Sequence, residues 1–265
     1  MKIVVIPDVQ VKPGVDITHI LAAGRYIVAH RPDVVVVLGD WWDMHSLSYF
    51  NSKLKVEGSR VLEDIQVGNT AMQLFLKPLW ELQAKQKEQK KKVYQPRLVY
   101  TVGNHDPQVR IPRYVEDNPI MQGMLDGEWT TDFLKQCGFE VHPYLEIVNI
   151  AGIRFSHYIQ NPHSAKKGPL SGMIDTQIKN AGFSFVQGHC QGLRMGKHYL
   201  GDGTQRIGIM AGSFYSHDED YMKPQGNASH WRGIIQLNEV KDGGADICEL
   251  SLNYLIRKYY KAEEK

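Results

Sequence analysis

Apolar runs that end in polar turns recur through the first hundred residues. Three such runs are "KIVVIP" (2–7), "DVVVVLGD" (33–40) and "RLVYTVGNHD" (97–106). Unbroken apolar runs of this length are typical of strands covered on both faces. Between them, residues 16–30 and about 60–92 place apolar side chains at helical spacing, and Pro78 is expected to kink or interrupt the second helix. The alternation predicts β-α-β units with a parallel sheet.

The second part of the chain is richer in strands. They are expected near 145–156 (a hairpin turning at Ala151-Gly152), 183–187, 206–211, 231–237 and 246–252. One helix is expected over about 171–181, ending at Gly182. Together the two parts predict an α/β protein with two mixed sheets packed face to face and helices outside. No repeat or linker divides the chain, so we expect a single domain over 1–265, with a helical insertion at about 50–95.

Composition narrows the function only slightly. A net charge of +2 indicates no particular partner, and the basic run "KQKEQKKK" (85–92) is either a solvated helix end or a phosphate-steering patch. Three dispersed cysteines with no CxxC pair favour neither a disulfide framework nor a cysteine zinc site. No apolar run approaches the roughly 18 residues of a membrane span or the pattern of a signal peptide. We therefore expect a cytoplasmic protein without a membrane partner, in a bacterium or a phage-infected host.

Chemically versatile side chains follow five of the predicted strands. They occur in "PDVQ" (7–10), "GDWWD" (39–43), "GNHD" (103–106), "SHY" (156–158) and "QGHCQG" (187–192). Each of these residues taken alone has an ordinary structural explanation, such as a turn residue or a buried histidine. The carboxyl ends of parallel strands meet at one edge of a sheet, so the five segments are expected to converge on one crevice.

The order and spacing of these motifs resemble the calcineurin-like metallophosphoesterases, over residues 3 to about 215. "GDWWD" and "GNHD" at this separation carry most of the resemblance, and the run after "GNHD" is similar to that of phage-encoded and bacterial members. The resemblance implies a four-layer α/β/β/α sandwich and an active site with two divalent metals. Such metals neutralise phosphate oxygens and activate water for attack on the ester.

The resemblance also implies a set of metal ligands. Asp40 would bridge the two metals. The second site would be completed by Asn104, His157 and His189, and the first by Asp8, with Gln10 and Gln191 beside it. Family members usually have histidine at the positions of Gln10 and Gln191. Because amide oxygens are harder donors than imidazole, an all-oxygen first site should prefer Mn²⁺ or Mg²⁺ over Zn²⁺. We expect Mn²⁺ first, with Mg²⁺, Fe²⁺ and Zn²⁺ as alternatives.

His105 resembles the family's histidine beside the scissile phosphate, and Asp43 would hold its ring. Four basic residues are candidates for binding substrate: Arg110, Arg113, Lys166 and Lys167. Arginine pairs well with phosphate oxygens, although surface positions would explain these residues equally well.

The sequence therefore predicts a phosphoesterase that uses two metals and water, with a phosphodiester of a nucleotide or nucleic acid as substrate. A phosphodiesterase or nuclease is favoured over a phosphomonoesterase. The alternative is a scaffold protein that keeps the fold and has lost the chemistry, since two histidine ligands are replaced by glutamine. Nothing in the sequence indicates the oligomeric state.

Overall fold

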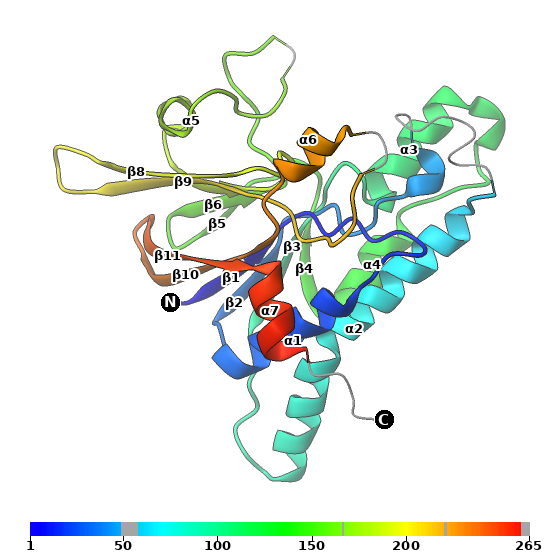
Figure 1. Ribbon diagram of the computed structural model, residues 1–265, viewed down its shortest axis with the longest axis horizontal. Coiled ribbons are helices and arrows are strands. Elements are labelled where there is room, and N and C mark those ends of the chain that lie inside the picture. Colours follow the sequence, from blue (N-terminus) through cyan, green and yellow to red (C-terminus); the bar gives the residue numbers. More distant parts are fainter. Residues whose placement is uncertain (49–57, 166, 220–221, 261–265) are drawn as a thin grey trace.

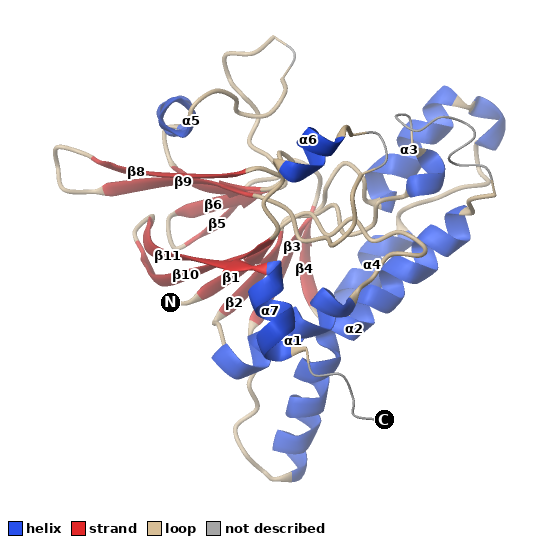
Figure 2. Cartoon of the chain, in the orientation of Figure 1, coloured by secondary structure: helices blue, strands red, loops and turns tan. Residues whose placement is uncertain are grey.

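Two mixed β-sheets lie face to face, with helices on both outer faces (Figures 1 and 2). The computed structural model describes residues 1–48, 58–165, 167–219 and 222–260. Separate apolar clusters fill the three interfaces between the four layers. The predicted α/β/β/α sandwich is confirmed.

The first sheet has six strands, and its central part is parallel. In spatial order the strands are β11 (Gly244–Ser251), β10 (Gly233–Lys241), β1 (Ile3–Ile6), β2 (Val34–Val37), β3 (Arg97–Thr101) and β4 (Phe139–His142). Strands β1 to β4 are parallel, whereas β10 is antiparallel to β1 and to β11. The first three predicted strands are therefore neighbours, and their carboxyl ends lie at one edge.

The second sheet has five strands and is also mixed. In spatial order they are β5 (Val148–Ile150), β6 (Ile153–Ser156), β7 (Ser184–Gln187), β9 (Gln205–Ala211) and β8 (Leu193–Tyr199). Strands β6, β7 and β9 are parallel, and β5 and β8 are antiparallel edge strands. The predicted hairpin turn is present, because Ala151 and Gly152 both have positive φ between β5 and β6.

Seven α-helices and two 3₁₀ turns are found within the described ranges. They are α1 (Thr18–His30), η1 (His45–Leu47), α2 (Val61–Glu88), α3 (Pro107–Asp117), η2 (Pro119–Met121), α4 (Trp129–Gln136), α5 (Ile174–Ala181), α6 (Pro224–Ala228) and α7 (Leu252–Tyr259). None of them has the length and apolarity needed to cross a membrane, so far as the described residues go. Helix α2 falls inside the range where an insertion was expected; that it is an insertion stays a prediction.

Strand β1 shows how one apolar run serves two interfaces. Ile3 and Val5 point between the sheets, and Val4 and Ile6 point toward the helical layer that contains α1, α2 and α7. All four side chains are fully buried. On the other side of the sandwich, Ile178 of α5 packs against Phe185 of the second sheet. Burial on both faces explains why the strand sequences are continuously apolar rather than alternating.

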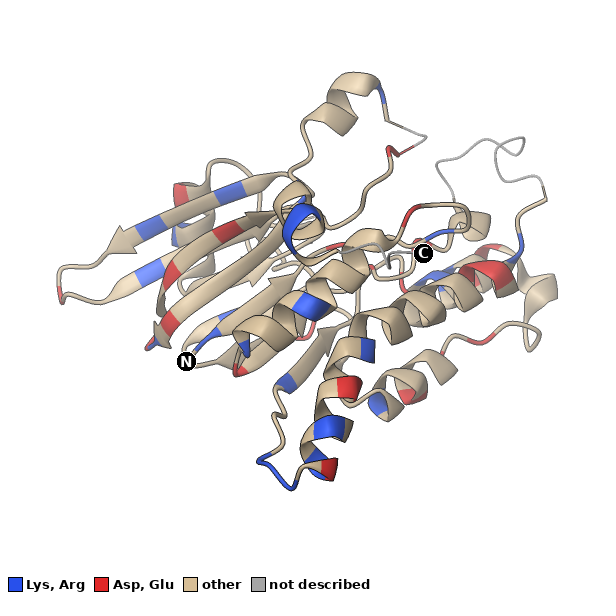
Figure 3. Ribbon diagram, turned by 60° about the horizontal axis from the view of Figure 1, so that its bottom comes forward, with Lys and Arg blue, Asp and Glu red and all other residues tan. Residues whose placement is uncertain are grey.

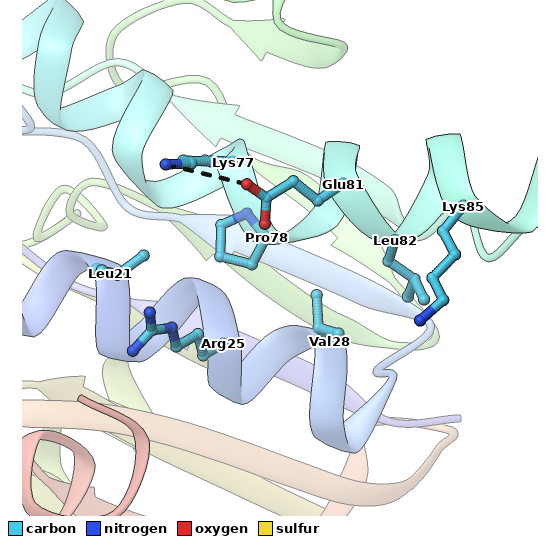
Figure 4. Close-up of a pocket in the computed structure, with 8 residues that line it drawn as sticks. All are labelled: Leu21, Arg25, Val28, Lys77, Pro78, Glu81, Leu82 and Lys85. Carbon is cyan, nitrogen blue, oxygen red and sulfur yellow. Dashed lines mark ion pairs between the residues drawn. The ribbon is translucent and has the colours of Figure 1, made fainter. Parts of the chain in front are cut away.

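Helices α1 and α2 lie side by side over the first sheet (Figure 4). Leu21 and Val28 of α1 and Leu82 of α2 line a hollow of about 360 Å³ between them. Helix α2 passes through Pro78 as one element, so the predicted interruption is wrong. Pro78 is buried in this interface, and packing of α2 on α1 compensates for the hydrogen bond that proline cannot make.

Candidate metal centre

The five predicted segments meet where the parallel strands of both sheets end. Asp8 and Gln10 follow β1, Asp40 follows β2, and Asn104 and His105 follow β3 in the first sheet. From the second sheet, His157 follows β6, and both His189 and Gln191 follow β7. The candidate centre therefore draws side chains from both sheets, as the convergence argument predicts.

The imidazole of His157 lies at the middle of a tight cluster. Its Nδ1 donates a hydrogen bond of 2.7 Å to the carbonyl oxygen of Leu38, which fixes the proton on that nitrogen. Its Nε2 faces three other electron-pair donors. They are Asn104 Oδ1 at 2.9 Å, His189 Nδ1 at 3.2 Å and Asp40 Oδ2 at 3.3 Å.

This cluster has the chemistry of a cation site. A proton on His157 Nε2 can be shared well with only one neighbour, whereas a metal ion can accept electron pairs from all of them. The ligand atoms of Asp40, His157 and His189 lie within 4.8 Å of one another. Mixed nitrogen and oxygen donors of this kind suit Mn²⁺, Fe²⁺ or Zn²⁺.

A second group of oxygens lies on the side of β1. Asp8 Oδ2 and Gln10 Oε1 are buried, and neither accepts a hydrogen bond from the described residues. Buried oxygens that lack a donor are costly, which indicates that a cation belongs beside them. Gln191 Oε1 accepts a hydrogen bond of 3.2 Å from the hydroxyl of Tyr215 and keeps a second lone pair. These residues fit the oxygen-rich first site predicted from the sequence.

The electrostatics of the cluster also favour a cation. Burial, partly opposed by His157, raises the pKa of Asp8 to about 6. Burial and the neighbouring His157 lower the pKa of His189 to about 4, so its ring is neutral at pH 7 and able to coordinate. Burial of Asp40 is outweighed by His157 and His105, which lower its pKa. Asp8 is therefore the carboxylate whose negative charge is poorly compensated in this cluster, and a cation beside it would stabilise that charge.

Local backbone geometry explains why these residues stand among glycines. Asp40 and His189 have φ values of 49° and 62°, which L-residues seldom adopt and which cost about 1–2 kcal/mol each. A Cβ on Gly103 would overlap the Asp40 carboxylate, and one on Gly188 would overlap that of Asp8. Gly103 of "GNHD" and Gly188 of "QGHCQG" are thus required by the close approach of the carboxylates.

Asp106 stands at the N-cap position of α3 but does not cap that helix. Its side chain makes no hydrogen bond to the start of α3. Instead the carboxylate accepts hydrogen bonds from the backbone N–H groups of Trp41 (2.9 Å), Gly103 (2.8 Å) and Asp40 (3.2 Å), and from the hydroxyl of Tyr100 (2.8 Å). Asp106 therefore ties the two metal-binding turns together and holds Asp40 in its strained conformation.

His105 and Asp43 form a buried pair beside the cluster. His105 Nδ1 donates to Asp43 Oδ1 at 3.0 Å, and its backbone N–H donates to Asp40 Oδ1 at 2.7 Å. Burial disfavours the charged ring, but Asp40 and Asp43 outweigh it and raise the pKa of His105 to about 9. Lys12, which the sequence did not single out, lies 3.9 Å from Asp43 Oδ2 and 3.3 Å from Glu219.

The cluster opens into a pocket of about 490 Å³, the metal-site pocket. Arg110 and Arg113 of α3 line it, and that they bind a phosphate stays a prediction. Four further lining residues, Tyr144, Tyr158, Met222 and His230, are not among the site residues predicted from the sequence. Cys190 also lines the pocket. These residues come from unrelated turns, so no local spacing marks them as neighbours.

Other substrate-binding candidates lie elsewhere. Lys167 is exposed on the loop after β6 and does not line the metal-site pocket. Lys166 lies outside the described residues. Tyr215 is fully buried and hydrogen-bonds to Gln191 and His230. Binding of substrate by the two lysines stays a prediction.

Comparisons with known proteins add little to this geometry. No family model matches the chain, and no curated protein matches it in sequence. A search of solved structures finds similarity to Yfce, a phosphoesterase from E. coli. The match has 13% sequence identity and a TM-score of 0.40, and it covers 96% of this chain and 100% of the other. Identity and TM-score this low leave the functional argument to the site itself.

Proposed function

We propose that this protein is a metal-dependent phosphoesterase that hydrolyses a phosphodiester. One observation carries the proposal: His157 Nε2 is surrounded by three electron-pair donors within 3.3 Å, and its own proton is held on the opposite nitrogen. A catalytic pair, His105 and Asp43, and a pocket with two arginines adjoin this cluster. Cation site, proton donor and phosphate-binding side chains are the parts that ester hydrolysis requires.

The residues would hold two ions in two sites that share one carboxylate. Asp40, Asn104, His157 and His189 form one site, and Asp8, Gln10, Asp40 and Gln191 form the other. Divalent ions bound there would supply positive charge against the phosphate oxygens and acidify water near the ester. Mn²⁺ is the first expectation, because most of the donors are oxygen.

The other residues of the pocket bind the ester and move its proton. Arg110 and Arg113 pair with non-bridging phosphate oxygens. The Asp43 carboxylate holds the His105 ring and favours its imidazolium form, whose Nε2–H can be donated to the leaving oxygen. Burial would raise the pKa of Asp43, but the hydrogen bond and charge of His105 lower it, helped by Lys12 at 3.9 Å from the second carboxylate oxygen.

Charge distribution favours a small phosphodiester, such as a nucleotide, over a nucleic-acid strand. Basic residues gather at the end of the long helix α2 (Figure 3), where the lysines of 85–92 lead into the amino end of β3. The proposed ligand Asn104 follows the carboxyl end of the same strand. The basic run and the metal-site pocket are thus at opposite edges of the first sheet. Steering by these lysines does not reach the proposed site.

Hydrolysis of bis-p-nitrophenyl phosphate by metal-stripped protein tests the proposal. We expect turnover to be absent after chelation and restored by Mn²⁺, because without cations the phosphate meets the charges of Asp8 and Asp40. Plasma emission spectroscopy should find up to two ions bound per chain. Folded protein that binds Mn²⁺ yet turns over no diester or monoester, with any divalent ion, would instead support the scaffold alternative.

The glutamines provide a second test. The double change Gln10→His and Gln191→His should tighten one of two metals and shift preference from Mn²⁺ toward Zn²⁺, because imidazole is the softer donor. Calorimetric titration with both ions measures this directly. A matched control is Gln122→His, at an exposed position outside the pocket. Identical stoichiometry and affinity in all three proteins would show that Gln10 and Gln191 are not ligands.

A further inference from the structure

A second hollow lies at the carboxyl ends of β3 and β4, next to the metal-site pocket. We call it the β4 pocket; its volume is about 310 Å³. Its lining comes from the ends of both strands and from helices α3 and α4 with the turns beside them. The lining residues are Val102, Gln108, Val109, Glu128, Thr131, Val141, Pro143 and Tyr144. In Figure 1 these elements lie together on one side of the first sheet.

The two pockets share structural walls. Tyr144 lines both of them. Helix α3 also serves both, since Val109 in its first turn lines the β4 pocket and the adjacent Arg110 lines the metal-site pocket. Asn104 and His105 stand in the short turn between Val102 and this helix. A molecule whose phosphate lay on the arginines would therefore have the β4 pocket directly beside it.

The walls of the β4 pocket are chemically two-sided. Val102, Val109, Val141, Pro143 and the Tyr144 ring form an apolar side, packed for the most part against the core of the first sheet. Three polar residues, Gln108, Glu128 and Thr131, form the other side. The amide nitrogen of Gln108 lies 3.5 Å from Thr131 Oγ1, and its Oε1 is buried without a hydrogen bond from the described part of the chain.

An apolar slot with hydrogen-bond acceptors at one side suits a flat heterocycle. The apolar side removes the ring faces from water, and the acceptors of Gln108 and Glu128 call for N–H donors on the ring edge. A volume of about 310 Å³ is at the small end of ordinary ligand sites, of roughly 300–1,000 Å³. The space therefore suits one base and no continuing strand.

We propose that the β4 pocket binds an amino-bearing heterocycle of nucleobase size, joined to the phosphate at the metal-site pocket. This inference rests on the proposed function and narrows its substrate to a diester of mononucleotide size. Val109 and Tyr144 provide the apolar contact, and Gln108 reads the amino group. The ester carrying such a base gains binding energy that a small alkyl ester cannot gain.

The main test uses two esters that release the same p-nitrophenolate. They are adenosine 5′-(p-nitrophenyl phosphate) and methyl p-nitrophenyl phosphate. Val109→Trp fills the pocket and should lower kcat/KM for the adenosine ester by about tenfold or more, with less than a twofold effect on the methyl ester. Glu116→Trp adds the same indole to an exposed position of α3 and serves as the control. Equal losses for both esters in Val109→Trp, or no preference for adenosine in the wild type, would overturn the proposal.

Binding of adenosine alone, in the presence of a chelator, separates this proposal from the proposed function. Wild type and Glu116→Trp should bind adenosine saturably in NMR titrations, and Val109→Trp should not. Gln108→Leu should remove the preference for adenosine over purine riboside, which lacks the amino group. Adenosine binding without turnover of any ester would reject the phosphoesterase and keep the pocket. Turnover of an ester without adenosine binding would reject the β4 pocket as a base-binding site and keep the phosphoesterase.

Discussion

Replacement of Asp40 with asparagine is expected to cost more than about a hundredfold in metal affinity, and to abolish Mn²⁺-dependent hydrolysis with it. Changing a residue that only supports a metal ligand already lowers metal affinity by roughly 10–100-fold, and Asp40 is itself proposed as a ligand of both ions. The amide keeps the shape of the side chain and one oxygen, so the turn held by Asp106 is retained. The change therefore isolates the negative charge.

Thermal unfolding with and without Mn²⁺ measures this effect without reference to catalysis. Wild-type protein at a free metal concentration of one hundred times its Kd gains about 2.7 kcal/mol, and Asp40→Asn should gain almost nothing. The metal-free variant should be somewhat less stable than wild type, because His157 and His105 outweigh burial, lower the pKa of Asp40 and so stabilise its charge in the folded protein; the metal-induced shift is therefore measured within each protein. Asp246→Asn, on an exposed position of β11, is the matched control. An unchanged metal-induced shift in Asp40→Asn would contradict the proposed centre.

Replacement of His105 with alanine should leave metal binding intact and reduce turnover by roughly 10²–10⁴-fold for esters with an alkoxide leaving group. The loss should be much smaller for esters that release p-nitrophenolate, because that leaving group departs without a proton. The ring of His105 is not among the side chains that surround His157 Nε2, so calorimetry should find wild-type stoichiometry.

Replacement of Asp43, the hydrogen-bond partner of His105, is expected to cause an intermediate loss of turnover. Asp43→Asn keeps a hydrogen-bonding side chain beside His105 Nδ1 but removes the charge that favours the imidazolium, so its loss should fall between wild type and His105→Ala. His163→Ala, at an exposed position, should behave as wild type. Equal losses for alkyl and aryl esters in His105→Ala would argue against a role as proton donor.

The sequence predicted the layers and the convergence of side chains because both depend on local pattern. Strands buried on both faces must be apolar throughout, as in β1 and β2, and the residues that follow parallel strands must share an edge. Strand β8 was missed because "LRMGKHY" is an edge strand with exposed Arg194 and Lys197 and carries no apolar signal. Strand β4, "FEVH", is too short to show a period.

Contacts between residues far apart in the chain produce no local sequence pattern and could not be predicted. Lys12 and Glu219 are 207 residues apart and form a buried ion pair, and neither position shows a motif. Asp106 stands directly before Pro107 at the start of α3, yet its carboxylate turns back toward Asp40 and Trp41. Proline inside a helix normally favours an interruption, but α2 continues through Pro78 because it packs on α1. Tertiary packing decided all three cases.

The proposed ligands come from the two sheets in comparable numbers, and the interface between these sheets is filled largely by apolar side chains. An ion held by Asp40 of the first sheet and by His157 and His189 of the second would cross-link the two sheets. Metal–ligand bonds have preferred directions, whereas the apolar contacts around them do not. Such an ion would fix the position of one sheet relative to the other, which apolar contacts alone specify less strictly. Binding of the cation and alignment of the two sheets would then stabilise each other.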